Sequence, residues 1–308
     1  MNNYCCIVIG ADGFIGSYIK KFLIQSGRNV LGTVYNRKPE ENSEIFLDMT
    51  NKKSFEVLPE GIPVINASGT VDQSLPASVI YRINTGGVKN IVEWAQKADV
   101  PHLVHLSSVG VYGNSVTGEN ITEDTPIRTH WPLSPFPYGR SKARAEKILQ
   151  KSGVPYTALR LPAVYGINDS FFTKELKKLF DKMEKKPFPP AGKKLVSLMP
   201  VDFMGPLCLK ILEANASDRS FNAAGIHVPW KTIVETFAEY LGITIKYAEK
   251  IKLSDYTAFS DPGLQMAVYY SSRGAHFPDD RLRDFLNWHE RPEWTKTLKE
   301  AAVSLKHK

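Results

Sequence analysis

Apolar runs and amphipathic stretches alternate along the first half of the chain. The apolar run Ile7–Ile9 ends in a glycine-rich turn, and a helical period follows over Ser17–Ser26. Later strands are expected at Asn29–Tyr35, Ile45–Leu47, Pro63–Asn66, Val100–Leu106 and Pro155–Leu161, with helices at Tyr81–Lys97 and Tyr138–Gln150. This order predicts an α/β fold whose doubly wound parallel sheet is covered by helices on both faces.

The second half of the chain mixes helices with short strands. Its predicted helices are Phe171–Lys186, Phe203–Ala214, Pro229–Leu241, Arg281–Trp288 and Trp294–Leu305, and its predicted strands are Leu195–Val201, Ser220–Ala223 and Thr244–Tyr247. A polar, proline-rich segment, Ser115–Pro137, precedes the Tyr138 helix. Long loops in compact domains are more often functional than idle, so this segment is a candidate functional loop.

The turn that follows the first strand carries Gly10, Gly13 and Gly16, spaced three apart. A strand, a tight turn and a helix N-terminus together present backbone N–H groups and partial positive charge to a phosphate. Glycine suits such a turn because a β-carbon would block the approach of a pyrophosphate. The spacing differs from the G-x-G-x-x-G fingerprint, so incidental glycines remain an alternative for the turn taken alone.

Composition places the chain among ordinary globular proteins, with 308 residues, 43% hydrophobic and 23% charged. One large domain or two closely joined ones are expected. The sequence has neither an apolar run of about 18 residues nor a signal-peptide pattern, so we expect no membrane association. Cys5, Cys6 and Cys208 are too few for a disulfide framework, and we expect a cytoplasmic protein without a metal site.

The net charge of +7 is compatible with an acidic partner. No nucleic-acid recognition motif accompanies the charge, so binding to nucleic acid is disfavoured. A solvated face, or attraction of a phosphorylated small molecule, explains the excess of lysine better.

The end of the second predicted strand carries Asn36, Arg37 and Lys38, with no acid before Glu40. In dinucleotide sites an acid near this point binds the ribose 2′-hydroxyl, whereas an arginine accommodates a 2′-phosphate. The two cations therefore favour NADP, with NAD as the second choice and a plain basic loop as the alternative reading. Small residues at 67–69 would let a ring or ribose lie against the backbone, or would simply form a turn.

Tyr138 and Lys142 lie four residues apart and so share one face of their predicted helix. A phenol has an ordinary pKa of about 10, which a nearby ammonium would lower. Ser108, at the end of a predicted strand, could bond the same substrate oxygen. The trio suits moving a proton to or from an alcohol while hydride moves at the same carbon. Its place after a strand in a parallel sheet is where such folds bind ligands.

Motifs along most of the chain resemble those of the extended short-chain dehydrogenase/reductases, in the NAD-dependent epimerase/dehydratase group. The matching segments are Gly10-x-x-Gly13-x-x-Gly16, Asp48, Ala67–Gly69, Asn84–Gly87, Leu106–Gly113, Tyr138–Lys142, Leu159–Gly166, Pro200–Asp202, Phe221–Ala223 and Leu286–Trp288. Each is weak alone, but their order along the chain is specific. The resemblance implies a Rossmann-like fold with a smaller C-terminal substrate lobe.

By this resemblance Tyr138 is the catalytic acid/base, Lys142 lowers its pKa and holds the nicotinamide ribose, and Ser108 orients the substrate oxygen. Asp48 would contact the adenine amine, and Asn84 would be structural or organise water. The candidate cofactor-binding residues are Gly10, Asp12, Gly13, Phe14, Ile15, Gly16, Asn36, Arg37, Lys38, Asp48, Met49, Ala67, Ser68, Gly69, Asn84, Ser107, Tyr138, Lys142, Leu161 and Val164.

The resemblance also implies a division of the chain. Residues 1–166 would form the dinucleotide-binding domain, and residues 167–308 mainly the substrate lobe, with about 195–228 returning to the main sheet. Members of the family are often homodimers through a bundle that includes the Tyr138 helix.

Departures from the family pattern narrow the chemistry. The Asp-Glu pair of the 4,6-dehydratases is replaced by Val109 and Gly110, which disfavours that dehydration. An arginine that grips the substrate diphosphate in many 4-epimerases is replaced by Val196, with Arg273 only a rough candidate for a second. Retained NAD suits epimerisation, whereas exchangeable NADPH suits net reduction.

Three functions follow from these observations. The favoured one is an NADP-preferring reductase or dehydrogenase of a carbonyl/alcohol pair, with a sugar nucleotide as one substrate class. The second is a nucleotide-sugar epimerase that retains NAD. The third is a catalytically inactive, cofactor-sensing regulator, which the intact Tyr138 and Lys142 argue against.

Overall fold

The protein is described from a computed structural model. The described residues are 4–113, 117–129, 137–169, 171–184, 187–190, 192–214, 217–250 and 262–305. Parts of the predicted functional loop, residues 114–116 and 130–136, lie outside them, as does the end of the predicted helix at 185–186.

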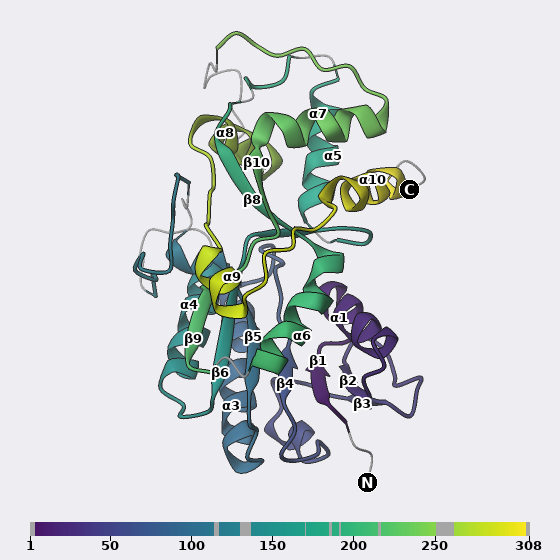
Figure 1. The fold of residues 1–308 in the computed structure, drawn as a ribbon, viewed down its shortest axis with the longest axis vertical. Coiled ribbons are helices and arrows are strands. Elements are labelled where there is room, and N and C mark those ends of the chain that lie inside the picture. Colours follow the sequence, from purple (N-terminus) through teal and green to yellow (C-terminus); the bar gives the residue numbers. More distant parts are fainter. Residues whose placement is uncertain are drawn as a thin grey trace.

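A seven-stranded sheet forms the larger part of the fold (Figure 1), and its strand pairs are all parallel. Its order is β3 (Glu44–Phe46), β2 (Val30–Val34), β1 (Cys6–Ile9), β4 (Val64–Asn66), β5 (Leu103–Ser108), β6 (Tyr156–Leu161) and β9 (Arg219–Asn222). The order reverses between β1 and β4, which is the switch point where doubly wound sheets bind ligands. The predicted Rossmann-like sheet is thus confirmed.

Helices cover the two faces of this sheet, as the alternating side chains of β1 dictate. Cys6 and Val8 pack in one apolar cluster with α1 (Phe14–Gln25) and α6 (Met204–Ala214). Ile7 and Ile9 pack in the other, with α3 (Gly87–Lys97) and α4 (Pro137–Gln150). A strand buried on both faces must be apolar throughout, which is why the sequence signal of β1 is a continuous run.

The helix predicted at Tyr81–Lys97 is in fact three consecutive segments. A short helix, α2 (Ala77–Tyr81), passes into a π-helical turn at Arg82–Gly86 and then into α3. Single π-helical turns often occur at functional sites, because the wider turn redirects one side chain. Here the buried residue of that turn is Asn84.

A smaller three-stranded sheet lies above the large one in Figure 1. Its order is β10 (Ile226–Pro229), β8 (Leu195–Pro200) and β7 (Ala163–Tyr165), and the helices around it are α5 (Phe172–Lys182), α7 (Trp230–Leu241), α8 (Pro262–Ser272) and α10 (Trp294–Ser304). Buried aromatic residues such as Tyr165 and Trp230 fill a separate core.

Three details of this half differ from the sequence-based expectation. Within the segment 195–228, β9 pairs in the large sheet and α6 packs on one face of it. In contrast, β8 pairs with β7 and β10 in the small sheet. The strands β7 and β10 were too short to give a periodic signal. The predicted strand Thr244–Tyr247 is wrong. Among the described residues, Tyr247 pairs with Phe188 in an isolated bridge, because there is no neighbouring strand along which the pairing could extend.

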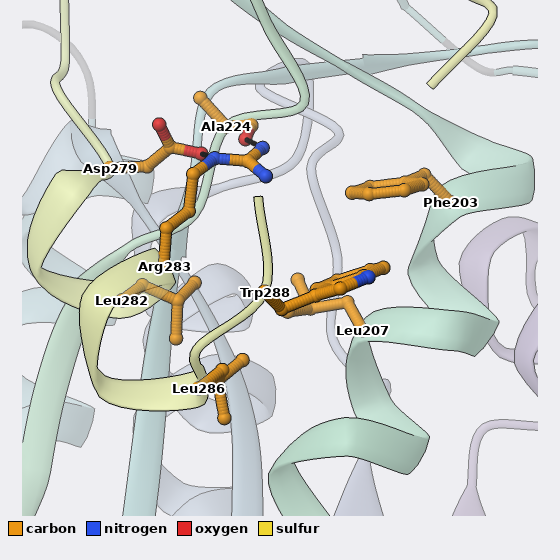
Figure 2. A pocket seen from close by; sticks show the side chains of 8 residues that line it. All are labelled: Phe203, Leu207, Ala224, Asp279, Leu282, Arg283, Leu286 and Trp288. Atoms are coloured by element: carbon orange, nitrogen blue, oxygen red, sulfur yellow. Dashed lines mark hydrogen bonds and ion pairs between the residues drawn. The ribbon is translucent and has the colours of Figure 1, made fainter. Parts of the chain in front are cut away.

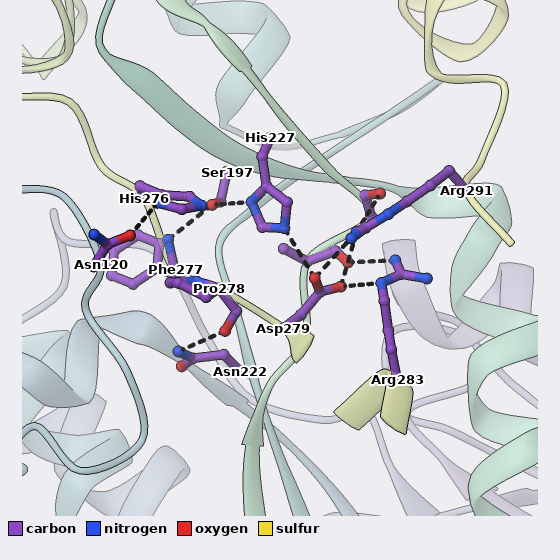
Figure 3. Close-up of polar contacts among 12 residues, drawn as sticks. Asn120, Ser197, Asn222, His227, His276, Phe277, Pro278, Asp279, Arg283 and Arg291 are labelled. Carbon is purple, nitrogen blue, oxygen red and sulfur yellow. Dashed lines mark hydrogen bonds and ion pairs between the residues drawn. The ribbon is translucent and has the colours of Figure 1, made fainter. Parts of the chain in front are cut away.

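A polar network centred on the buried Asp279 joins the small sheet to the segment that precedes α9 (Asp280–Leu286) (Figure 3). The Oγ of Ser197 on β8 lies 2.8 Å from Nδ1 of His227 on β10, and His227 Nε2 lies 2.9 Å from Asp279 Oδ1. Arg283 and Arg291 also donate to the Asp279 carboxylate, at 2.8 and 3.1 Å. Because every member is bonded, the network fixes the segment before α9 against the small sheet.

Within the described ranges, no helix is long and apolar enough to span a bilayer. The same residues hold no group of three or more His, Cys, Asp or Glu placed to bind a metal ion.

Candidate active site

The glycine turn between β1 and α1 is closed by contacts that tolerate no side chain. Gly10 has φ +82°, and its carbonyl accepts a hydrogen bond from Gly13 N at 3.1 Å. A β-carbon on Gly16 would lie 2.1 Å from Gly10 O. Gly13 has no side chain to cap α1, so the N–H groups of the first turn receive no side-chain acceptor from the cap residue. The residues therefore fit a pyrophosphate.

Gly16→Ala tests this turn. The new methyl group cannot coexist with Gly10 O, so the turn must open, at a cost of about 1–3 kcal/mol in unfolding free energy. Nucleotide binding should fall by about a hundredfold, measured by fluorescence titration with NADH. Gly86→Ala is the control, because its β-carbon would lie no closer than 3.8 Å to Tyr81 O. Equal nucleotide binding in both variants would contradict a phosphate-binding role.

The turn that follows β4 lies against the glycine turn. Asn66 Oδ1 accepts hydrogen bonds from Ser68 N at 3.1 Å and from Ser68 Oγ at 2.5 Å. A β-carbon on Gly10 would lie 3.0 Å from Ser68 Cα. Ala67, Ser68 and Gly69 thus flank the glycine turn at the switch point, as a strip of backbone on which a cofactor could lie.

Asn84 ties this strip to α4. Its Oδ1 accepts from Thr70 N at 2.8 Å, and its Nδ2 donates to Thr70 O at 2.9 Å and to Ser141 Oγ at 3.0 Å. A β-carbon on Gly69, which has φ +136°, would lie 2.9 Å from Asn84 Oδ1. These bonds fit the structural role expected for Asn84; its role toward water stays a prediction.

Ser108 and Tyr138 meet at the carboxyl end of β5. A 3₁₀ turn, Val109–Tyr112, follows Ser108, whose Oγ accepts from Gly110 N at 3.0 Å. Tyr138 lies in the first turn of α4. Burial raises the pKa of Tyr138, and a hydrogen bond with Ser108 opposes that rise. The pair is placed to share one substrate oxygen.

Lys142 lies one helical turn beyond Tyr138 and is 6% exposed. Its Nζ donates to Leu106 O at 2.8 Å and lies 3.5 Å from the point where a Gly69 β-carbon would be. Burial lowers the pKa of Lys142 to about 8, against the opposing charge of Glu146. The lowering of the Tyr138 pKa by Lys142 stays a prediction. Here burial raises the Tyr138 pKa, and the ammonium is turned to the Leu106 carbonyl.

The lowered pKa of Lys142 makes stability depend on pH. Free lysine titrates near pH 10.4, so between about pH 8 and 10 the unfolded chain binds the proton more tightly than the folded protein does. The penalty of the buried charge is therefore complete below pH 8 and is relieved as the pH rises. Lys142→Met should be more stable than wild type at pH 7, by on the order of 2 kcal/mol. The gap should shrink toward pH 10 in urea unfolding; a constant gap would contradict a buried ammonium.

A buried ion pair between α4 and β6 was missed by sequence reasoning. Glu146 accepts from Ser107 Oγ at 2.5 Å and from Arg160 Nη2 at 2.8 Å, and Arg160 Nη1 donates to the Tyr112 hydroxyl at 3.0 Å. Tyr112 in turn donates to Asn222 Oδ1 at 2.6 Å. The signals in the sequence were an arginine inside an apolar strand and a glutamate four residues after Lys142. Because the Ser107 O–H donates to Glu146, the hydroxyl could only accept a hydrogen bond from a cofactor.

One of the two cations at the basic end of β2 is engaged in an ion pair. Arg37 donates through Nη1 and Nη2 to the two carboxylate oxygens of Glu44, each at 2.7 Å. Lys38 is exposed, and Asn36 donates to Asp12. The Arg37 charge is thus paired with a carboxylate seven residues away, and the preference for NADP stays a prediction.

The remaining predicted cofactor contacts lie around the same edge of the sheet. Asp48 Oδ1 accepts from Thr50 N and Oγ1, each at 2.8 Å. Met49 is buried, and its side chain fills the space where Gly87 lacks a β-carbon. Leu161 ends β6, and the half-buried Val164 lies in β7. Phe14 and Ile15 open α1, so their backbone N–H groups belong to the first turn.

The sequence pattern of the NAD dependent epimerase/dehydratase family matches residues 6–224. The chain belongs to this family. The matched region includes the glycine turn, Ser108, Tyr138 and Lys142, and ends just beyond β9.

Relatives in this family include sugar-nucleotide epimerases. A UDP-glucose 4-epimerase from Lactobacillus helveticus is 29% identical over 177 residues, which are 52% of this chain and 52% of that protein. The chain thus matches about half the length of this curated relative. The Bordetella bronchiseptica enzyme WbmH, solved in complex with NAD+, shares the fold with a TM-score of 0.77 at 17% identity, over 98% of both chains. The UDP-Glc/GlcNAc 4-epimerase of Campylobacter jejuni gives 0.74 at 16%, over 98% and 99%.

The residues expected to contact a substrate diphosphate do not form a recognisable site. Val196 is fully buried in β8 and cannot reach a diphosphate, while Arg273 is exposed. A small cavity lies between α6 and α9 (Figure 2), lined by Phe203, Leu207, Ala224, Asp279, Leu282, Arg283, Leu286 and Trp288. None of these is a predicted site residue, and the cavity's apolar side chains belong to the core on the α1/α6 face of the sheet.

Proposed function

We propose that the protein is a nucleotide-sugar epimerase that retains NAD, rather than an NADPH-consuming reductase. The observation that carries the redox chemistry is the meeting of Ser108 and Tyr138 at the carboxyl end of β5, beside the glycine turn and Lys142. The pairing of Arg37 with Glu44 favours NAD over NADP, because it removes the cation best placed for a 2′-phosphate.

In this proposal the chain's own residues handle the proton. Tyr138 takes the proton of a sugar hydroxyl when the carbinol carbon is oxidised and returns it when the ketone is reduced on its other face. Ser108 donates a hydrogen bond that holds that oxygen. Lys142 adds positive charge near the ribose and the phenol, and Asn84 fixes the backbone between them. NAD, when bound, supplies the acceptor and donor of hydride.

The proposed substrate class rests on the chain's relatives and on the lack of an acid pair after Ser108. Val109 and Gly110 form the 3₁₀ turn where dehydratases of the family carry an acid pair, so the turn offers no carboxyl group for elimination. We infer that UDP-hexoses are the first substrates to test, because matched relatives are named as UDP-sugar 4-epimerases. The residues after Gly166 that surround the small sheet would hold the sugar and the uridine diphosphate.

The proposal is tested by incubating the purified protein with UDP-glucose or UDP-galactose and following the sugar by NMR. We expect the two sugars to interconvert with no net change in NADH. Protein denatured after purification should release NAD in a ratio near one per chain. Steady consumption of NADPH with a ketone substrate, and release of no NAD, would instead support the reductase.

A further inference from the structure

The acid that usually ends the second strand of a dinucleotide site is missing here, and another acid occupies its place. Asn36 follows β2 where an Asp or Glu would bind the ribose 2′-hydroxyl. Asp12, inside the glycine turn, reaches across to this point. Its Oδ2 accepts from Tyr35 N at 2.9 Å, Asn36 N at 2.6 Å and Asn36 Nδ2 at 3.1 Å.

These three bonds hold the Asp12 carboxylate at the carboxyl end of β2. They all end on one oxygen, so within the described part of the chain the other oxygen, Oδ1, keeps its lone pairs for a ligand. Two backbone N–H donors bond the ionised form of the carboxyl group. A negative charge is thus placed beside the phosphate-binding turn, within reach of whatever occupies the adenosine ribose site.

Glu44 controls the neighbouring cation. Its side chain is 2% exposed, and it holds Arg37 through two bonds of 2.7 Å, Lys20 Nζ at 2.7 Å and Glu40 N at 3.0 Å. These donors keep the pKa of Glu44 well below its usual range, so the carboxylate stays ionised. The Arg37 guanidinium is therefore paired in plane with Glu44 and turned to β3.

We propose that Asp12 binds the ribose 2′-hydroxyl and that Glu44 withholds Arg37 from a 2′-phosphate, so that the two acids together select NAD over NADP. This inference rests on the proposed function. A carboxylate accepts a hydrogen bond from a 2′-hydroxyl but repels a phosphate of like charge. An arginine freed from Glu44 would reverse part of that preference, because its planar fork matches phosphate geometry.

The test is binding of NADH and NADPH, followed by nucleotide fluorescence, to protein from which bound nucleotide has been removed by dialysis against denaturant and refolding. Wild type should bind NADH at least about a hundredfold more tightly than NADPH. Asp12→Asn should weaken NADH binding about tenfold and tighten NADPH binding by about threefold or more, because the 2′-hydroxyl loses a charged acceptor and the 2′-phosphate loses a neighbour of like charge.

Glu44 and Arg37 are tested by a double-mutant cycle. Glu44→Gln should tighten NADPH binding about tenfold by releasing Arg37, and adding Arg37→Ala should remove that gain. Arg37→Ala alone should change neither nucleotide by more than about threefold. Thermal unfolding of each variant separates these effects from misfolding, since Lys20 keeps Glu41 as a partner at 3.0 Å.

The outcomes separate this inference from the proposed function. If wild type binds NADH and Asp12→Asn binds it equally well, the role of Asp12 is overturned while the epimerase proposal stands. If Arg37→Ala alone abolishes NADPH binding, Arg37 is not withheld and the role of Glu44 is overturned. If folded wild type binds neither nucleotide, the proposed function and this inference both fail.

Discussion

Tyr138→Phe is expected to lower the turnover of a UDP-hexose about a thousandfold while leaving NAD bound. The substitution removes only the hydroxyl that exchanges the proton, and general acid–base catalysis of this kind contributes about 10²–10⁴-fold. The phenylalanine ring keeps the packing at the start of α4, so unfolding free energy and released NAD should match wild type. The measurement is kcat by NMR, together with NAD released per chain.

Tyr81→Phe is the matched control for that experiment. Its ring lies under Arg144, at 4.6 Å from the guanidinium carbon, and loses only a hydroxyl when replaced. It should retain wild-type turnover. If Tyr138→Phe also retained turnover, the proton would have to move through another group and the assignment of Tyr138 would be wrong.

Glu146→Ala is expected to cost about 3–5 kcal/mol of unfolding free energy, the largest loss of stability among the substitutions considered. Glu146 is fully buried, and its removal leaves the Arg160 guanidinium, 4% exposed, without its carboxylate partner. The Ser107 hydroxyl loses its acceptor at the same time. Urea unfolding monitored by tryptophan fluorescence measures the change.

Glu213→Ala provides the comparison, because Glu213 forms an ion pair of the same length, 2.8 Å, with Arg28 at the surface. Both partners of that pair are about half exposed, so its loss should cost less than about 1 kcal/mol. Similar losses in the two variants would contradict the view that burial, rather than pairing alone, makes Glu146 indispensable.

The large sheet was predictable because its central strands are buried on both faces and most of them leave continuous apolar runs. The run at β1, followed by three glycines, predicted a strand, a turn and a helix, and the structure has all three. The small sheet was harder, since β7 has three residues and β10 has four, too few to show a period. Leu195–Pro200 looked like one more strand of the main sheet, and its partner strand could be learned only from the fold.

The relative placement of two site residues was predictable where both lie on one helix. Tyr138 and Lys142 share a helix face by period alone, whereas Asn84 depends on a π-helical turn that propensities do not foresee. The pairing of Arg37 with Glu44 was not predictable, for a different reason. A charge in a sequence has no known partner, and Glu44 becomes one only because β3 pairs beside β2.

In the proposed reaction, hydride leaves one sugar carbon and returns to the same carbon within a single site. A UDP-hexose carrying deuterium at the inverted carbon tests it most directly, with the reaction run in ordinary water and the product examined by NMR. We expect the epimerised sugar to keep its deuterium at that carbon. Loss of the label to water, or its transfer to free NADPH, would contradict it.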